Sequence, residues 1–470
     1  MSSHRGLTAL AVLVVATVSV SALTSCSSRS DDTIAPSGSV STTPLNPFEQ
    51  QRSDGVTALL DQLSSVLKTG DVAGLDALID RSAPAAFRAR MHTIAASFAA
   101  KGDRGTRGGP LSASTFSYRL APSTGAERLL GEQWVSRLEE QGSTDTWVSP
   151  VELSYALGGA RTPGLDEPVV TLTETMSFAR YDDDWKIVGD GTLAPDPTPT
   201  TIKTAGPAEV GPWEFGGLAA IDVKTAGGSS TVLSYPKTES TTAAVAKALP
   251  AAVTAVDEFW GEDWPRRAAV VATGGPDEFA GLTRTQSAET RTAAAATVFS
   301  RIDKQDKKVI GQRIVLSPNA ASLSGPALAV VLRHELMHVA TRLITAENAP
   351  LWLTEGVPEY VGRRGTYREF IDAAPDLAAA VAGGDLPKTL PADSAFAVDS
   401  DAARVAYQSA WSFAAFVADK YGEDKLKALY TLVAKGGDSP TQDAAITAAL
   451  GRDKAALIKQ WQSWLREQIR

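Results

Sequence analysis

Two histidines and a glutamate stand together in the run HELMH at positions 334–338. On a helix, residues four apart point along one face, so His334 and His338 could each direct a ring nitrogen to one Zn²⁺ at ~2.1 Å. Glu335, turned about 100° from His334, would lie beside the metal, where a general base for a zinc-bound water is needed. The pattern predicts metal-assisted hydrolysis. The alternative is an exposed histidine pair that holds no metal.

The composition restricts which other residues could complete such a site. The chain has one cysteine, so it can form neither an intrachain disulfide nor a CxxC site, and it has only four histidines. A hydrolytic zinc needs three protein ligands and one open position. The stretch WLTEG at 352–356 offers the carboxylate of Glu355 downstream of the histidines.

The order HELMH, then WLTEG, then Glu359-Tyr360-Val361 resembles the gluzincin metallopeptidases. This resemblance implies that Glu355 is the third ligand of one Zn²⁺ per chain, and that the substrate is a peptide or protein. Glu359 would face the same way and could accept a hydrogen bond from His334, fixing its tautomer. The alternative for either glutamate is an ordinary helix residue without a role at a metal.

A proline departs from the expected pattern. Pro358 lies between Glu355 and Glu359, where it deletes a helical hydrogen bond unless it falls in a first turn. If Thr354 caps the helix, Pro358 is tolerated. If the helix begins at Pro350, we expect a kink near Glu355.

Hydrolysis of a peptide also needs a group that stabilises the oxyanion. The segment RVAYQSAWSF follows the expected zinc ligands, where the aminopeptidase branch of the gluzincins carries a catalytic tyrosine, so Tyr407 is the candidate. Its alternative role is packing beside Trp411. Tyr360 and Tyr367 are further alternatives for the oxyanion.

The same resemblance suggests how a substrate would lie. Gluzincins place an extended substrate against an edge strand, which we expect at GQRIVLSPNA, residues 311–320. The GAMEN-type motif that binds a free substrate amine in the aminopeptidase branch is absent before HELMH. This absence favours an endopeptidase.

The elements that would position these residues form a C-terminal domain over 215–470. Gly325-Pro326 starts the helix of the motif, and the chain after it reads as helical almost to the end. We expect a bilobal zincin domain with a strand-rich upper lobe and a helical lower lobe. The expected strands are 218–225, 231–235, 267–272, 296–302 and 313–316, with a helix at 239–260.

A first domain is expected over 53–192. Apolar residues recur at helical spacing from Val56, alternation with period two follows, and a hairpin is expected over 182–184. This order, with KTGDVAGLDALI and FARYDDDWKIV, resembles nuclear-transport-factor-two-like domains and implies a cone-shaped α+β fold without a defined activity. His92 is expected to be a surface or packing residue. Residues 193–214, rich in Pro and Thr, are expected to be a linker.

The start of the chain is predicted to be a targeting signal. Residues 1–25 have the form of a signal peptide, and Leu23-Thr24-Ser25-Cys26 resembles a bacterial lipobox, which implies lipidation of Cys26. The alternative is a free thiol at the edge of a transmembrane anchor. Residues 26–52 are expected to be a disordered tether. The signal peptide and the lipidated cysteine together imply that the protein is extracytoplasmic and anchored to the cell membrane.

The whole-chain composition limits the functional classes. Of 470 residues, 43% are hydrophobic and 21% charged, which excludes a wholly disordered or multi-span membrane chain. The net charge of −9 argues against a nucleic-acid partner.

Taken together, the motifs predict a zinc peptidase with Glu335 as the general base. The alternatives are a catalytically silent zincin-fold lipoprotein serving as a binding or assembly module, and a structural zinc, which would need a fourth ligand. The oligomeric state is left open.

Overall fold

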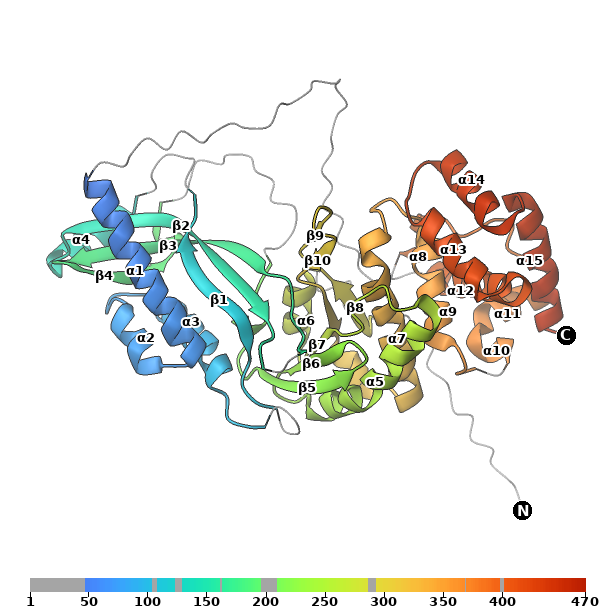
Figure 1. The fold of residues 1–470 in the computed structure, drawn as a ribbon, viewed down its shortest axis with the longest axis horizontal. Coiled ribbons are helices and arrows are strands. Elements are labelled where there is room, and N and C mark those ends of the chain that lie inside the picture. The colour runs from blue at the N-terminus through green and yellow to red at the C-terminus, as the bar shows by residue number, and fades with distance from the viewer. Residues whose placement is uncertain are drawn as a thin grey trace, which may run out of the picture. The chain divides into compact units, whose positions relative to one another are not determined.

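The computed structural model describes residues 47–103, 108–122, 129–160, 163–195, 209–285, 293–367, 369–397 and 401–470 (Figure 1). The expected signal peptide and Cys26 lie outside this part of the chain. The chain divides into two compact units, which separate between Ala220 and Ile221, except that the described residues 163–165 belong to the C-terminal unit. None of the helices in the described part is long and apolar enough to cross a membrane.

Within its described residues, the N-terminal unit consists of three α-helices followed by an antiparallel sheet, with a fourth α-helix between the first two strands, which confirms the α+β prediction (Figure 1). The strands lie in the order β1-β2-β3-β4 with antiparallel neighbours, and the predicted hairpin joins β3 to β4. The elements are α1 Pro47–Thr69, α2 Val72–Leu78, α3 Ala85–Ala99, β1 Ala113–Leu120, α4 Glu132–Glu140, β2 Asp145–Leu157, β3 Val170–Tyr181, β4 Asp184–Asp190, η1 Gly191–Leu193 and η2 Pro212–Glu214.

Both ends of this unit extend beyond the segment that we expected. Helix α1 begins at Pro47, inside the predicted tether 26–52; its first turn is exposed, so no apolar period marks it in the sequence. At the other end, Trp213 is fully buried and packs edge-on against Phe116 and Tyr155. The last residues of the expected linker 193–214 therefore contribute to the core of the first unit.

The C-terminal unit contains a five-stranded sheet followed by helices. The sheet order is β5-β6-β7-β11-β8, with β6, β7 and β11 parallel and β8 antiparallel to β11. The strands are β5 Ala219–Thr225, β6 Gly228–Ser234, β7 Ala269–Ala272, β8 Ala295–Val298 and β11 Arg313–Leu316, and β9 Arg301–Asp303 pairs separately with β10 Lys308–Ile310. The helices are α5 Glu239–Trp260, α6 Pro276–Thr283, η3 Pro318–Ser322, α7 Gly325–Thr341, η4 Arg342–Ile344, α8 Leu351–Thr354, α9 Gly356–Arg363, α10 Phe370–Ala373, α11 Pro375–Ala382, η5 Asp393–Phe396, α12 Asp401–Tyr421, α13 Glu423–Val433, α14 Ser439–Leu450 and α15 Lys454–Gln468.

The predicted edge strand is wrong. Strand β11, in the segment 311–320, pairs with β7 on one side and with β8 on the other, so it lies inside the sheet. Strand β8 ends the sheet among the described residues. The sequence pattern of one strand does not reveal its partners, because pairing depends on residues distant in the chain.

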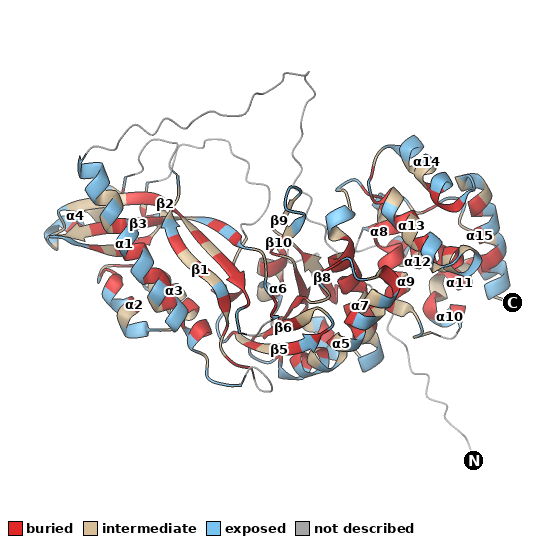
Figure 2. Ribbon diagram, in the orientation of Figure 1, coloured by how far each residue is buried: buried red, intermediate tan, exposed pale blue. Residues whose placement is uncertain are grey.

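One continuous hydrophobic core holds the sheet and the helices of the C-terminal unit together. It extends from Val232 in β6, through Val331 and Leu332 in α7, to Trp461 in α15. Figure 2 shows α7 largely in the colour of buried residues. The helix that carries HELMH therefore lies in the core, which fixes the direction of its side chains.

Candidate metal centre

The HELMH motif lies in α7, which begins at Gly325 as the sequence predicts. The hydroxyl of Ser324 accepts a hydrogen bond from the backbone of Ala327 at 3.4 Å and so caps the helix. His334 and Glu335 are fully buried, and 15% of the His338 side chain is exposed. The histidine pair is therefore not the exposed pair of the alternative interpretation.

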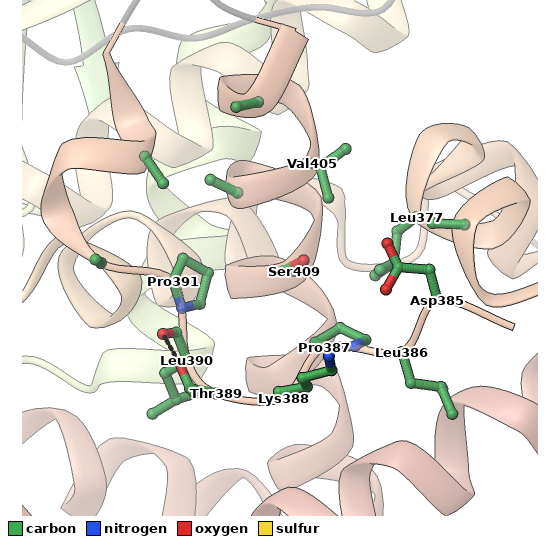
Figure 3. A pocket seen from close by; sticks show the side chains of 15 residues that line it. Leu377, Asp385, Leu386, Pro387, Lys388, Thr389, Leu390, Pro391, Val405 and Ser409 are labelled. Carbon is green, nitrogen blue, oxygen red and sulfur yellow. Dashed lines mark hydrogen bonds between the residues drawn. The ribbon is translucent and has the colours of Figure 1, made fainter.

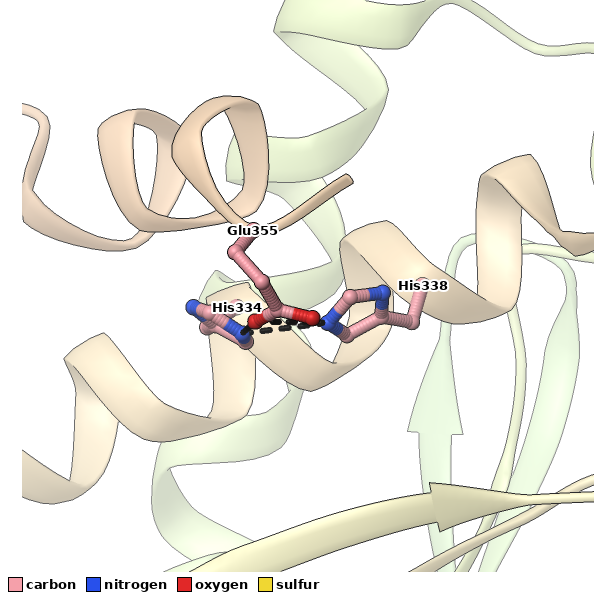
Figure 4. A group of neighbouring side chains, drawn as sticks. All are labelled: His334, His338 and Glu355. Carbon is pink, nitrogen blue, oxygen red and sulfur yellow. Dashed lines mark hydrogen bonds and ion pairs between the residues drawn. The ribbon is translucent and has the colours of Figure 1, made fainter. Parts of the chain in front are cut away.

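Three side-chain atoms converge beside α7 (Figure 4). Nε2 of His334 lies 3.1 Å from Nε2 of His338 and 3.5 Å from Oε2 of Glu355, and the His338–Glu355 distance is 3.9 Å. Four ligands arranged tetrahedrally at ~2.1 Å from a zinc ion lie ~3.4 Å from one another. The two imidazoles and the carboxylate thus fit three of the four positions around a zinc ion.

The position of Glu355 depends on a break in the helix. Helix α8 ends at Thr354 and α9 begins at Gly356, with Glu355 between them at φ −100° and ψ −40°. Pro358 falls in the first turn of α9, where its missing N–H is tolerated. The structure therefore combines the two expected alternatives, because a short helix starts after Pro350 and is interrupted at Glu355, while Pro358 falls in the first turn of the next helix.

Two glycines let α9 approach its neighbours closely. A Cβ at Gly356 would lie 2.6 Å from the carbonyl oxygen of Ala410 in α12, and one at Gly362 would lie 2.9 Å from that of Val330 in α7. Both distances are shorter than a side chain allows. The glycines therefore permit the packing that brings Glu355 to the histidines.

Glu359 contacts Nδ1 of His334, whereas Nε2 of the same ring faces His338 and Glu355. Oε2 of Glu359 accepts a hydrogen bond from Nδ1 of His334 at 2.9 Å, which leaves Nε2 of that ring for a metal. Its Oε1 accepts from Nε of Arg363 at 2.8 Å. Burial disfavours the Glu359 carboxylate, but the positive charge of Arg363, together with the hydrogen bonds from His334 and Arg363 and the charge of His334, outweighs burial and lowers the pKa of Glu359 to about 2. The sequence analysis missed Arg363, although its position four residues after Glu359 was a signal.

The two histidines are not both expected to be positively charged imidazolium ions when their Nε2 atoms lie 3.1 Å apart. Burial disfavours the imidazolium of His334, but hydrogen bonds to Glu355 and Glu359 outweigh burial and raise its pKa to about 10. Burial, with the positive charge on His334, holds the pKa of His338 well below its ordinary value. The surrounding carboxylates therefore favour one positive charge at this point, as they would favour a divalent cation.

Glu335 lies beside the three converging atoms and is not one of them. Its Oε2 accepts a hydrogen bond from the hydroxyl of Thr297 at 2.6 Å, whereas its Oε1 is buried without a hydrogen-bond partner among the described residues. Burial raises the pKa of Glu335 to about 7. A carboxyl group with these properties can exchange a proton near neutral pH, and Thr297 is a contact that the sequence analysis did not foresee.

Tyr407 is buried on α12, and its ring packs edge-on against Phe396 with centroids 5.0 Å apart. Burial, followed by the negative charge of Glu355 and the two other glutamates, holds its pKa well above the ordinary value. Tyr407 thus lies within electrostatic reach of the site. The alternatives are engaged elsewhere, because the hydroxyl of Tyr360 donates to Glu423 and Tyr367 packs against Arg363.

A cavity of about 410 Å³ opens beside α12 (Figure 3). It is lined by the segment from Asp385 to Ala392 and by α12 residues such as Val405 and Ser409. None of the predicted site residues lines it, and Tyr407 lies on another face of α12.

In the N-terminal unit, His92 lies at the surface with Nε2 2.8 Å from Asp76, as expected for a residue without a catalytic role.

Comparison with known proteins supports the interpretation of this site. A family model described as Peptidase MA superfamily matches residues 312–467, which include HELMH, Glu355, Glu359 and Tyr407. The match supports a gluzincin-like zinc peptidase domain in this part of the chain. A search of curated proteins returns no match.

Several solved structures are similar at low identity. They include an M1 zinc metallopeptidase from Deinococcus radiodurans (13% identity, TM-score 0.32, 69% of this chain and 62% of that one). A mutant of an M1 zinc metallopeptidase from the same organism gives 11% identity and a TM-score of 0.31 over 69% of this chain and 62% of that one. A mutant of this kind bound to a Tyr-Ser-Ala substrate gives 12% identity and a TM-score of 0.31, over 78% of this chain and 72% of that one. This chain thus spans less than two thirds of the first two proteins. At these TM-scores the likeness carries no argument about activity.

Proposed function

We propose that this protein is a zinc-dependent endopeptidase that holds one zinc ion per chain at His334, His338 and Glu355. The observation that carries the proposal is the convergence of these three ligand atoms at distances of 3.1 to 3.9 Å. A bound zinc ion would supply Lewis acidity toward a peptide carbonyl and toward water.

The residues of the chain would do the remaining work. Glu335 would take a proton from the attacking water on its unpartnered oxygen and deliver it to the leaving amine. Glu359, held by Arg363, would keep His334 in the tautomer that a metal needs. Tyr407 would donate a hydrogen bond to the oxyanion.

An extended peptide would bind along β8 rather than along β11, because β8 has an edge that no described strand occupies. Main-chain hydrogen bonds along such an edge do not require a free substrate terminus. This mode of binding, together with the absence of a GAMEN-type motif, supports an endopeptidase.

The test compares wild type with Glu335→Gln after both proteins are loaded with zinc, using a peptide library and mass spectrometry. Glu335→Gln should retain zinc and lose about 100- to 10,000-fold in rate, as expected when a general base is removed. If the loaded wild type cleaves no peptide faster than the variant, the protein is instead a silent zincin-fold module.

We also propose that Cys26 carries a lipid that anchors the mature protein outside the cytoplasmic membrane. The support is the single cysteine at the end of an apolar leader. Expression in a bacterium that processes lipoproteins, followed by mass spectrometry of the N-terminal peptide, tests this. Cys26→Ser should release the protein from the membrane fraction, and an unmodified thiol in the wild type would contradict the proposal.

A further inference from the structure

The two carboxylate oxygens of Glu335 have different surroundings. Oε2 accepts the Thr297 hydroxyl at 2.6 Å, and this hydroxyl also lies 3.2 Å from the backbone oxygen of Glu335. Oε1 is buried and has no hydrogen-bond partner among the described residues. A hydroxyl donated to one oxygen of a carboxylate restricts its rotation and leaves the other oxygen available for a proton.

Thr297 belongs to β8, the strand at the end of the sheet. The register pairs Thr297 with Ile314, and the backbone N–H of Ser317 donates to the carbonyl of Ala294 at 2.9 Å. In an antiparallel ladder, residues that bond to the neighbour alternate with residues that do not. Ala294, Ala296 and Val298 therefore bond toward β11.

The intervening residues, Ala295 and Thr297, direct their backbone N–H and C=O groups to the outer edge. No strand in the described part of the chain pairs with that edge. The side chain of Thr297 stands roughly perpendicular to the sheet and reaches Glu335 in α7. One residue thus presents its backbone to the open edge and its hydroxyl to the buried carboxylate.

We infer that Thr297 is a positioning residue, which holds Glu335 in one rotamer and links it to the strand edge where an extended peptide would bind. The inference rests on the proposed peptidase function for its kinetic consequence, and on the structure alone for the hydrogen bond. A substrate strand that pairs with Thr297 would thereby fix the position of the scissile bond relative to Glu335.

The test uses the full-length, zinc-loaded protein with Thr297→Val, which keeps the shape and removes the hydroxyl, and Thr297→Ser, which keeps the hydroxyl. Thr297→Val should retain zinc and lower kcat about 10- to 100-fold, the loss expected from removing one hydrogen bond to a charged group. KM should change little, and Thr297→Ser should recover most of the rate. Thr231→Val, in β6 of the same sheet, is the matched control and should leave kcat unchanged.

Crystal structures of both variants provide a readout that does not depend on activity. In Thr297→Val the Glu335 side chain should adopt more than one rotamer, whereas Thr297→Ser should keep the single wild-type rotamer. A single wild-type rotamer in Thr297→Val, or an unchanged kcat, would overturn the inference. If wild type itself shows no hydrolysis, the proposed function fails, and the rotamers alone decide the role of Thr297.

Discussion

Nε of Arg363 donates a hydrogen bond to Oε1 of Glu359 at 2.8 Å, one turn along α9, while the other oxygen of Glu359 accepts from His334. The guanidinium also lies over the ring of Trp411, 5.8 Å from its centroid. A positive charge thus holds the buried carboxylate that orients a predicted metal ligand. The consequence is that zinc affinity should depend on a residue that does not touch the metal.

Replacing Arg363 by Met should weaken zinc binding about 10- to 100-fold, because Glu359 would lose the partner that fixes it against His334. Competition with a chelator of known affinity measures the change. Arg364→Met is the matched control, because Arg364 pairs with Glu423, and it should bind zinc as tightly as wild type. Equal affinities for wild type and Arg363→Met would show that Arg363 has no part in holding the site.

Replacing Glu355 by Ala should reduce zinc affinity by more than about 100-fold, because losing a direct ligand costs more than losing an outer partner. Metal analysis of dialysed protein measures the zinc content. Glu347→Ala, which removes an exposed glutamate shortly before α8, should keep full zinc content. A full complement of zinc in Glu355→Ala would mean that another group completes the site.

Tyr407→Phe should keep zinc and the packing against Phe396, but it should lower kcat about 100-fold, as when one oxyanion donor is lost. Steady-state kinetics on a cleaved peptide measures the effect. Tyr421→Phe, which removes a hydroxyl bonded to Gln460, serves as the control. A fully active Tyr407→Phe variant would leave Tyr407 with its packing role alone.

Gly356→Ala should destabilise the fold by about 1–3 kcal/mol, because its Cβ would meet the Ala410 carbonyl and force α9 away from α12. Urea unfolding of the metal-free protein measures the free energy. Gly325→Ala is the comparison, since nothing lies within 4 Å of a Cβ there. If both variants unfold alike, the close approach of the two helices does not require a glycine.

Asp438 caps α14, and its Oδ1 accepts hydrogen bonds from the hydroxyl and the backbone N–H of Thr441. These bonds lower the pKa of Asp438 below the ordinary value of an aspartate. Since the folded-state pKa is the lower one, the ionised cap stabilises the fold above the unfolded pKa, and this contribution is lost as the pH falls through the folded pKa. The difference in Tm between wild type and Asp438→Asn should therefore shrink from about pH 6 to about pH 3. A constant difference would contradict the assignment.

The local features of the site could be predicted because they depend on short-range geometry. Residues four apart on a helix share a face, so HELMH alone brings His334 near His338 and places Glu335 to one side. The order of helices and strands followed in the same way from apolar periods of 3.6 and 2 residues. The start of α1 and the burial of Trp213 were missed, because neither leaves a periodic signal nearby.

The sequence by itself determined which residue types could bind a metal and which of them would share a helix face. Only the tertiary structure decided that Glu355 reaches the histidines, that β8 rather than β11 ends the sheet, and that the hydroxyl of Thr297 contacts Glu335. The physical reason is that each of these contacts joins segments far apart in the chain. Such contacts depend on close packing between elements, including the approach that Gly356 and Gly362 permit, and no pattern within one segment specifies them.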